Sequence, residues 1–412
     1  MHYPKRLFIP SGINTKAQLG PKLAKHADKY NYLLHYLISA QAFDKRLSPE
    51  SYIPVNTRYF EKYVTANHVA PIFSFWITQG VVERQPKPLG RAGYVVGKKS
   101  IGYRLTADYA TRRVIDVGYI DDKFEAKVDK ITKEFREGKM DMTVDSNAFI
   151  FFNLRELRIN AVAAHQRINK LLTTGTYSLK RANSATVKVQ SIREGNWFCL
   201  RDMKGHRIHN NWCTLNKNLR QDCFIETGEQ LVNIDVRNSQ PVILAILLRQ
   251  RFTIDTLTPD VLHYIELCEE GLLYEHLAAK FGIDITDDDA RTAFKKMLFK
   301  TIFYGHNEAA KKYAEWTCFQ DEFPTVAAFI TEYKRYDYTA LSIALQRLES
   351  EIMIEGVIAT IASQHNPEDF FALTIHDSIT TTVSNQEFVL GLLREEFAMR
   401  GIKPSFVTDY LN

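Results

Sequence analysis

Apolar residues recur at helical spacing near the start of the chain, and later they alternate with polar residues over short segments. Tyr32, Leu33, Tyr36, Leu37 and Ala40 follow one another at helical intervals, which predicts an amphipathic helix. The segment FFALTIHDSITTTV alternates instead, as the two strands of a β-hairpin do. The pattern therefore predicts an α+β fold.

Between the first helix and residue 105, the pattern predicts two further helices and three strands. The second helix starts after Pro54 with Asn56 or Thr57 as its cap, and the third covers Pro71 to Gln79. Strands are expected at residues 81–84, 94–96 and 103–105, with a loop rich in Pro and Gly before the second of them. This order of elements resembles a winged helix-turn-helix.

Basic residues are concentrated in the segment 84–113. They are opposed by Asp108 alone, and they comprise Arg84, Lys87, Arg91, Lys98, Lys99, Arg104, Arg112 and Arg113. A wing that lies on nucleic-acid phosphates needs such a charge. The alternative is a solvated hairpin on a module that contacts protein.

Residues 119–172 are predicted to be largely helical, as a connector or thumb would be. The segment TTGTYSLKRANSAT that follows is rich in Thr, Ser and Gly. It predicts a boundary before the last part of the chain.

Asp235 lies at the end of a predicted strand, in the segment GEQLVNIDVRNSQPVILAILL. A helix is expected after Pro241, which is tolerated in a first helical turn. The Asp235 carboxylate and the backbone carbonyl of Val236 can bind a hard ion such as Mg²⁺. The alternative is a helix cap or turn residue.

Asp377 is predicted at the tip of the β-hairpin, directly after His376. If the hairpin and the strand of Asp235 are neighbours in one sheet, the two carboxylates can share two metal ions about 3.5–4 Å apart. His376 is either a contact to a primer end or a packed histidine.

A basic helix, RTAFKKMLFKTIFYG, lies between the two aspartates in the chain. Lys296, Lys300 and Tyr304 form one stripe on it, and Arg291 and Lys295 form another. Either stripe could meet a triphosphate, whereas the alternative is a solvated cationic face. Tyr304 before Gly305 suits a platform for a base or sugar.

The composition adds few restrictions. With 412 residues, 45% of them hydrophobic, the chain is long enough for two or three packed units. It has neither a long apolar segment nor a signal-like start, so an intracellular protein without membrane contact is expected. Five cysteines without C-x-x-C spacing suggest packing, and the net charge of +5 permits nucleic acid as a partner.

The ordered set D-x-x-x-S-Q, R-x3-K…Y-G and H-D-S resembles the three motifs of family A DNA polymerases and of the single-subunit RNA polymerases of phages and mitochondria. The resemblance covers roughly Asp202 to Thr382. The upstream segment GHRIHNNW, with Leu219 and Arg220, is similar to the family's duplex-contacting segment. ALQRLESEIM around Gln346 resembles its glutamine-bearing helix.

The resemblance implies a role for each matching residue. Asp235, Asp377 and Val236 would hold two Mg²⁺ ions, or Mn²⁺ in their place. Lys296 is assigned first to catalysis, and the nucleotide-binding residues would be Arg291, Lys295, Lys300 and Tyr304. The residues that would contact primer and template are Arg207, His209, Arg220, Gln240, Gln346 and His376.

Two departures from the family pattern matter. The DNA polymerase motif D-x-S-Q-x-E ends in a glutamate that excludes ribose, and Val242 is expected at that position here, so weak sugar discrimination is predicted. Arg291 lies one residue further from Tyr304 than in the family, which predicts either a bulge in the helix or a different equivalent for Arg291. A proofreading exonuclease signature is not found before residue 200.

These observations predict a right-hand palm and fingers core over residues 196–412, a helical connector or thumb over 116–195, and a winged helix-turn-helix domain over 1–115. The expected activity is template-directed nucleotidyl transfer from nucleoside triphosphates onto DNA or an RNA–DNA hybrid, in a phage or plasmid replication system. A single-subunit RNA polymerase or primase, and a non-catalytic DNA-binding replication or regulatory protein, are the alternatives.

Overall fold

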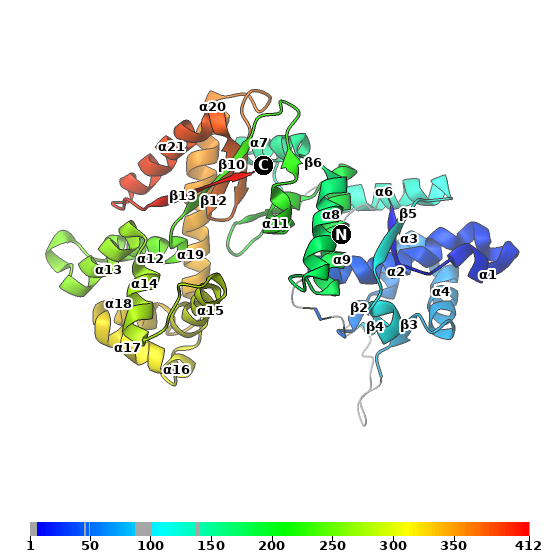
Figure 1. Ribbon diagram of the computed structural model, residues 1–412, viewed down its shortest axis with the longest axis horizontal. Helices are drawn as coiled ribbons and strands as arrows, with labels where there is room; N and C mark the ends of the chain where they lie inside the picture. The colour runs from blue at the N-terminus through cyan, green and yellow to red at the C-terminus, as the bar shows by residue number, and fades with distance from the viewer. Residues whose placement is uncertain (1–5, 45–46, 49, 87–99, 137–139, 412) are drawn as a thin grey trace. The chain divides into compact units, whose positions relative to one another are not determined.

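The computed structural model describes residues 6–44, 47–48, 50–86, 100–136 and 140–411. The chain forms two compact units, drawn in Figure 1. The first comprises Met1–Met140, Leu157–Cys199 and Asn210–Glu226, and the second comprises Asp141–Glu156, Leu200–His209 and Thr227–Asn412. The predicted division into three parts, residues 1–115, 116–195 and 196–412, has other boundaries than these two units, and it stays a prediction.

The first unit combines helices with short strands. Its elements are β1 (Leu7–Pro10), α1 (Thr15–Leu23), the 3₁₀ helix η1 (Ala24–His26), α2 (Ala27–Phe43), β2 (Ile53–Val55), α3 (Thr57–Val64), α4 (Ala66–Thr78), β3 (Val82–Arg84), β4 (Ile101–Leu105), α5 (Ala107–Ala110), β5 (Val114–Val117), α6 (Asp122–Arg136), β6 (Arg158–Ile159), α8 (Ala161–Thr173), α9 (Leu179–Arg193), α10 (Asn211–Thr214), α11 (Lys217–Arg220) and β9 (Cys223–Phe224). Among the described residues, no helix has the length and apolarity needed to cross a bilayer.

The segment from α2 to β4 contains the three predicted helices and the predicted strands β3 and β4, together with β2, a strand between the first two helices that was not predicted. β4 lies between β2 and β3 in an antiparallel three-stranded sheet. Asn56 caps α3, because its side chain accepts a hydrogen bond from the Tyr59 amide at 3.1 Å. The strand predicted at residues 94–96 lies outside the described residues.

The third predicted helix was placed too late. It begins at Ala66, and Pro71 lies inside it. Thr65, with a φ of 69°, separates this helix from the preceding one. The buried Val69 and Trp76 lie on either side of Pro71, so the apolar face continues past a residue that we expected to start the helix.

The predicted boundary segment, residues 173–186, is helical over much of its length. Ser178 caps α9 by accepting from the Arg181 amide, and the helix then runs to Arg193. Ala182 and Ala185 are fully buried, and α9 packs against α2 and α8. The small residues of this segment allow close helix packing, and the predicted boundary itself stays a prediction.

The second unit contains a four-stranded sheet surrounded by helices. Its elements are α7 (Asp145–Glu156), β7 (Cys199–Arg201), β8 (Ile208–Asn210), β10 (Leu231–Val236), α12 (Ser239–Arg251), the 3₁₀ helix η2 (Ile254–Thr256), α13 (Pro259–Glu270), α14 (Leu273–Phe281), α15 (Asp288–Leu298), the π-helix η3 (Phe299–Phe303), α16 (Asn307–Ala310), α17 (Ala314–Glu322), α18 (Pro324–Tyr333), α19 (Ala340–Ser350), the π-helix η4 (Glu351–Ile358), α20 (Ala359–Gln364), β11 (Ala372–Ile375), β12 (Ser378–Thr382), the 3₁₀ helix η5 (Val383–Asn385), α21 (Gln386–Met399) and β13 (Phe406–Leu411).

The four-stranded sheet has the order β11-β12-β10-β13, and all its strand pairs are antiparallel. Val232, Ile234 and Val236 alternate along β10 and are buried on one face. Helix α21 contacts β10 and β12, and η4 contacts β11 (Figure 1). The opposite face of β10 carries Asn233 and Asp235.

Asn233 joins the two central strands through its side chain. Its Oδ1 atom accepts hydrogen bonds from the hydroxyls of Ser378 at 3.1 Å and Thr380 at 2.8 Å, and all three residues are buried. Asn233→Val should therefore lower the free energy of unfolding by about 2 kcal/mol, because buried hydroxyls lose an acceptor.

A double-mutant cycle with Thr380→Val checks this prediction through urea unfolding. The double variant should lose less stability than the sum of the single losses, because it replaces both partners by apolar groups. Strict additivity would show that this hydrogen bond does not couple the strands.

Candidate functional site

Strand pairing places Asp235 and Asp377 at neighbouring strand ends. Asp235 is directly opposite Ser378 in the β10–β12 ladder, and Asp377 immediately precedes Ser378. Asp377 follows His376, which has a φ of 55°, in the two-residue turn between β11 and β12. The predicted hairpin, and the predicted position of Asp235 near a strand end, are both confirmed.

The Asp377 carboxyl group lies in a partly desolvated position. Burial raises its pKa, whereas a backbone hydrogen bond, Arg207, a hydrogen bond from Ser239 and the Lys295 ammonium act in the opposite direction. Ser239 is the first residue of α12, so the helix that follows β10 also supports the carboxylate of the neighbouring hairpin.

Lys295 is the cation of α15 whose charge interacts with both aspartates. Burial lowers its pKa, as does Arg291, while Asp235, Glu275 and Asp377 raise it. Its Nζ atom lies 5.1 Å from the ring centroid of Tyr274. Its charge interaction with both aspartates links Lys295 to the candidate site.

The other cations of this helix have different surroundings. Arg291 Nη1 forms an ion pair with Glu275 Oε1 at 2.6 Å. Lys296 and Lys300 are exposed, and Lys300 Nζ lies 5.8 Å from the Tyr313 ring centroid. The structure therefore groups Lys295 with the aspartates, and the role assigned to Lys296 stays a prediction.

The extra residue between Arg291 and Tyr304 is accommodated by a π-helix. The Tyr304 amide donates to the carbonyl oxygen of Phe299 at 2.8 Å, five residues back, as a π-helix requires. Phe299 and Tyr304 stack with ring centroids 5.3 Å apart. The structure thus contains the bulge that the sequence predicted.

Lys334 fixes the end of this π-helix. Its ammonium donates to the carbonyl oxygens of Ile302 at 2.8 Å and Gly305 at 3.0 Å, on either side of Tyr304. Burial lowers the Lys334 pKa to about 8. A Cβ atom at Gly305 would clash with the carbonyl oxygen of Lys300, so the turn needs glycine.

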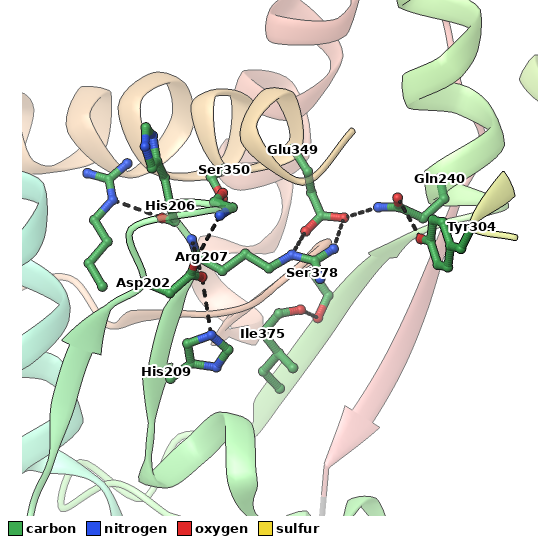
Figure 2. Close-up of polar contacts among 12 residues, drawn as sticks. Asp202, His206, Arg207, His209, Gln240, Tyr304, Glu349, Ser350, Ile375 and Ser378 are labelled. Atoms are coloured by element: carbon green, nitrogen blue, oxygen red, sulfur yellow. Dashed lines mark hydrogen bonds and ion pairs between the residues drawn. The ribbon is translucent and has the colours of Figure 1, made fainter. Parts of the chain in front are cut away.

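A polar relay, whose central residues Gln240 and Glu349 are buried, connects Tyr304 to Arg207, as Figure 2 shows. The Tyr304 hydroxyl donates to Gln240 Oε1 at 3.1 Å, and Gln240 Nε2 donates to Glu349 Oε2 at 2.5 Å. Arg207 binds the same carboxylate through two hydrogen bonds, from Nε at 2.7 Å and from Nη2 at 2.8 Å. Tyr304, Gln240, Glu349 and Arg207 are called the relay below.

Asp202 shapes the turn that presents Arg207. Its carboxylate accepts hydrogen bonds from the amides of Lys204, Gly205 and Arg207 at 2.6–3.1 Å. His209 Nε2 lies 3.3 Å from Asp202 Oδ2 (Figure 2), and its ring centroid lies 5.6 Å from that of His376. Two histidines predicted to contact the primer are therefore neighbours.

Val242 was expected at the position of the family's sugar-excluding glutamate, and that role stays a prediction. The Val242 side chain is fully buried, whereas Gln240 contacts the Tyr304 hydroxyl. Gln240 lies five residues after Asp235, the separation of aspartate and glutamate in the motif D-x-S-Q-x-E.

Glu349 is a residue that the sequence analysis missed. It is 1% exposed, and burial raises its pKa to about 7 against the opposing effect of Arg207. Its signal in the sequence is a carboxylate on the apolar stripe formed by Leu341, Leu345 and Ile352, where an unpaired charge would be costly. Gln346, the residue predicted there, instead packs over Gly205.

Comparison with known proteins gives a coarse result. No protein-family model matches the chain, and no curated protein matches it. Among solved structures, it is similar to the POL domain of Pol1 from M. smegmatis in complex with DNA primer-template and dNTP. That match has a TM-score of 0.41 and 13% identity, and it covers 60% of this chain and 55% of that chain. The likeness is to a polymerase domain in broad outline, and no residue role is inferred from it.

Arg220 belongs to the first unit. There its guanidinium lies 5.5 Å from the ring centroid of Trp212. The relay and the two aspartates belong to the second unit, so the contact of Arg220 with a primer or template stays a prediction.

The basic segment 84–113 is only partly described. Lys87, Arg91, Lys98 and Lys99 lie outside the described residues. Arg104 pairs with Glu83 at 2.5 Å, and Arg112 lies 4.0 Å from the Tyr109 ring centroid and donates to the Ser11 carbonyl. Arg84 is exposed. Contact of this segment with nucleic acid stays a prediction.

Ionisation of Glu349 should be visible in the pH dependence of folding. The Glu349 pKa is about 7 in the folded protein, above its ordinary value of 4.5. The protonated carboxyl group therefore adds its full contribution to the free energy of unfolding below pH 4.5, and this contribution is lost as the pH rises through 7. Urea unfolding of the native protein and of Glu349→Gln should be compared from pH 4 to 8. The native protein should lose stability relative to the variant as pH rises, whereas a constant difference would contradict the raised pKa.

Proposed function

We propose that this chain is a template-directed nucleotidyltransferase that extends a primer with nucleoside triphosphates. The observation that carries the proposal is the placement of Asp235 and Asp377 at neighbouring strand ends, with Lys295 interacting with both carboxylates. Carboxylates that hold divalent ions and a cation for a triphosphate are the groups that phosphoryl transfer requires. The motif resemblance to family A polymerases supports the same function.

The donor set fits divalent metal ions. Asp235 and Asp377 offer carboxylate oxygens, which Mg²⁺ prefers, and a raised carboxyl pKa shows that the site needs compensating positive charge. The backbone carbonyl of Val236 is an additional candidate ligand. Two bound Mg²⁺ ions, or Mn²⁺ in their place, would neutralise charge on the attacking and leaving oxygens.

Lys295 and Arg291 would bind the triphosphate from α15. Arg291 is paired with Glu275 at 2.6 Å, so triphosphate binding would exchange one anionic partner for another. Arg207, His209 and His376 would contact the primer-template.

The relay would set the shape of the sugar pocket. Tyr304 offers a ring beside the nascent base pair, and Gln240 would lie against the 2′ position of the incoming nucleotide. Glu349 and Arg207 would hold Gln240 in place, because Gln240 donates directly to the Glu349 carboxylate.

The segment from α2 to β4 would act as a winged helix. Its order of helix, strand, two helices and two strands, with β4 between β2 and β3, supports this proposal. It would recruit the enzyme to DNA in the replication of a phage or plasmid.

Asp235→Asn and Asp377→Asn should each reduce primer extension by at least about a thousandfold, because removing charge from a phosphoryl-transfer clamp costs several kcal/mol. Extension by the purified full-length protein with Mg²⁺ measures this. Asp369→Asn, at an exposed position before β11, is the control and should extend normally. Near-normal extension by Asp377→Asn would overturn the assignment.

Lys295→Ala should reduce single-nucleotide incorporation by about a hundredfold, because Lys295 is a cation of α15 whose charge interacts with both carboxylates. Lys296→Ala is the matched control one residue away and should have a much smaller effect. The measurement is the incorporation rate at several triphosphate concentrations, with primer-template binding measured separately. The reverse order of effects would restore Lys296 as the functional cation.

Gln240→Ala should weaken discrimination against ribonucleotides by about tenfold to a hundredfold, because it removes the side chain that contacts Tyr304. The native protein is now expected to prefer dNTPs. Kinetics with matched dNTP and rNTP check this, and Glu349→Ala should change the same ratio because Glu349 positions Gln240. A preference of the native protein for rNTPs would favour the RNA polymerase or primase alternative.

A further inference from the structure

Two histidines and a glutamate converge between three helices that carry none of the relay residues. His263 comes from α13, His276 from α14, and Glu322 is the last residue of α17. One ligand atom from each residue lies within 4.8 Å of the other two. His276 Nε2 is 2.7 Å from Glu322 Oε1, and the two imidazole centroids are 5.1 Å apart.

The surroundings of this cluster resemble the outer shell of a metal site. Lys280 Nζ lies 2.8 Å from the second oxygen of Glu322, which leaves Oε1 directed at His276. Glu266 Oε2 lies 4.0 Å from His263 Nδ1, and the Phe323 ring centroid lies 6.0 Å from the centroid of each histidine. Outer-shell partners of this kind orient ligands, and an apolar neighbour limits access of water.

We propose that His263, His276 and Glu322 form a binding site for Zn²⁺ or a similar transition-metal ion. Two imidazole nitrogens and one carboxylate oxygen suit Zn²⁺, which takes such ligands in tetrahedral sites and leaves a position for water. Mg²⁺ is a poor occupant, because it prefers oxygen ligands. The site is therefore chemically distinct from the pair Asp235 and Asp377.

The position of α14 gives the site a structural consequence. Two residues of α14 that precede His276 contact the cations of α15. The Tyr274 ring packs against the Lys295 ammonium, and Glu275 forms an ion pair with Arg291. An ion bound to His276 would connect α14 to α13 and α17. It would thereby fix the position of α14, whose residues contact Lys295 and Arg291. Ion binding itself does not depend on the proposed polymerase function.

Without an ion, the same side chains would form only a network of His276, Glu322 and Lys280. Their distances of 2.7 and 2.8 Å suit such a network. His263 distinguishes the two cases, because the network does not need its imidazole, whereas a metal site does.

The test is Zn²⁺ binding to the full-length protein, freed of metal with a chelator and titrated against a chromophoric Zn²⁺ indicator in excess Mg²⁺. The protein should bind one Zn²⁺, and His263→Gln and His276→Gln should each weaken binding by at least about a hundredfold, since loss of outer-shell partners alone costs tenfold to a hundredfold. His365→Gln is the control and should bind Zn²⁺ as the native protein does. Circular dichroism checks that each variant is folded.

A second readout uses stability. Zn²⁺ should raise the midpoint of thermal unfolding of the native protein and of His365→Gln, but not of His263→Gln, whose side chain is exposed and expected to be dispensable for folding. The absence of Zn²⁺ binding in excess Mg²⁺, or equal binding by His263→Gln and the native protein, would overturn the proposal. Zn²⁺ binding is measured without primer extension, so its outcome does not depend on whether the protein is a polymerase. The metal-site proposal and the polymerase proposal can therefore fail separately.

Discussion

The antiparallel pairing of β10 with β12 brings the two aspartates of the candidate site together. It places Asp235 opposite Ser378 and hence beside the turn that carries Asp377. Because a one-residue slip in register would turn Asp235 to the other face of the sheet, the register has to be fixed. Asn233 fixes it by accepting hydrogen bonds from two hydroxyls of β12. The helix that follows β10 then contributes Ser239 and Gln240.

The relay satisfies the buried carboxylate of Glu349 with hydrogen bonds from Arg207 and Gln240. A carboxylate as buried as Glu349 is costly unless it is paired and hydrogen-bonded, and Arg207 and Gln240 together provide those partners. Removing one member would leave the others buried with unsatisfied groups. The orientation of Gln240 therefore depends on a residue more than a hundred positions away in the chain.

Local patterns predicted much of this arrangement. Alternation around His376 predicted the hairpin, the polar end of an apolar strand predicted the place of Asp235, and the extra residue before Tyr304 predicted a bulge that the structure contains as η3. Each of these features is set by residues close in the chain, so a short window of sequence contains the information.

The features that escaped prediction depend on tertiary packing. Lys295 and Lys296 are equally basic in sequence, and only the packing of α15 shows that Lys295 is half-buried near the carboxylates. Glu349 gains its importance from Arg207 on a distant hairpin.

We propose that this site joins a nucleotide to a primer under the direction of a template. The most direct measurement is single-nucleotide incorporation by the full-length protein with Mg²⁺ on primer-templates that differ only in the first unpaired template base. We predict that each template directs incorporation of its complementary nucleotide and that a primer without template is not extended. Incorporation that ignores the template base, or no incorporation on any of the templates, would contradict the account.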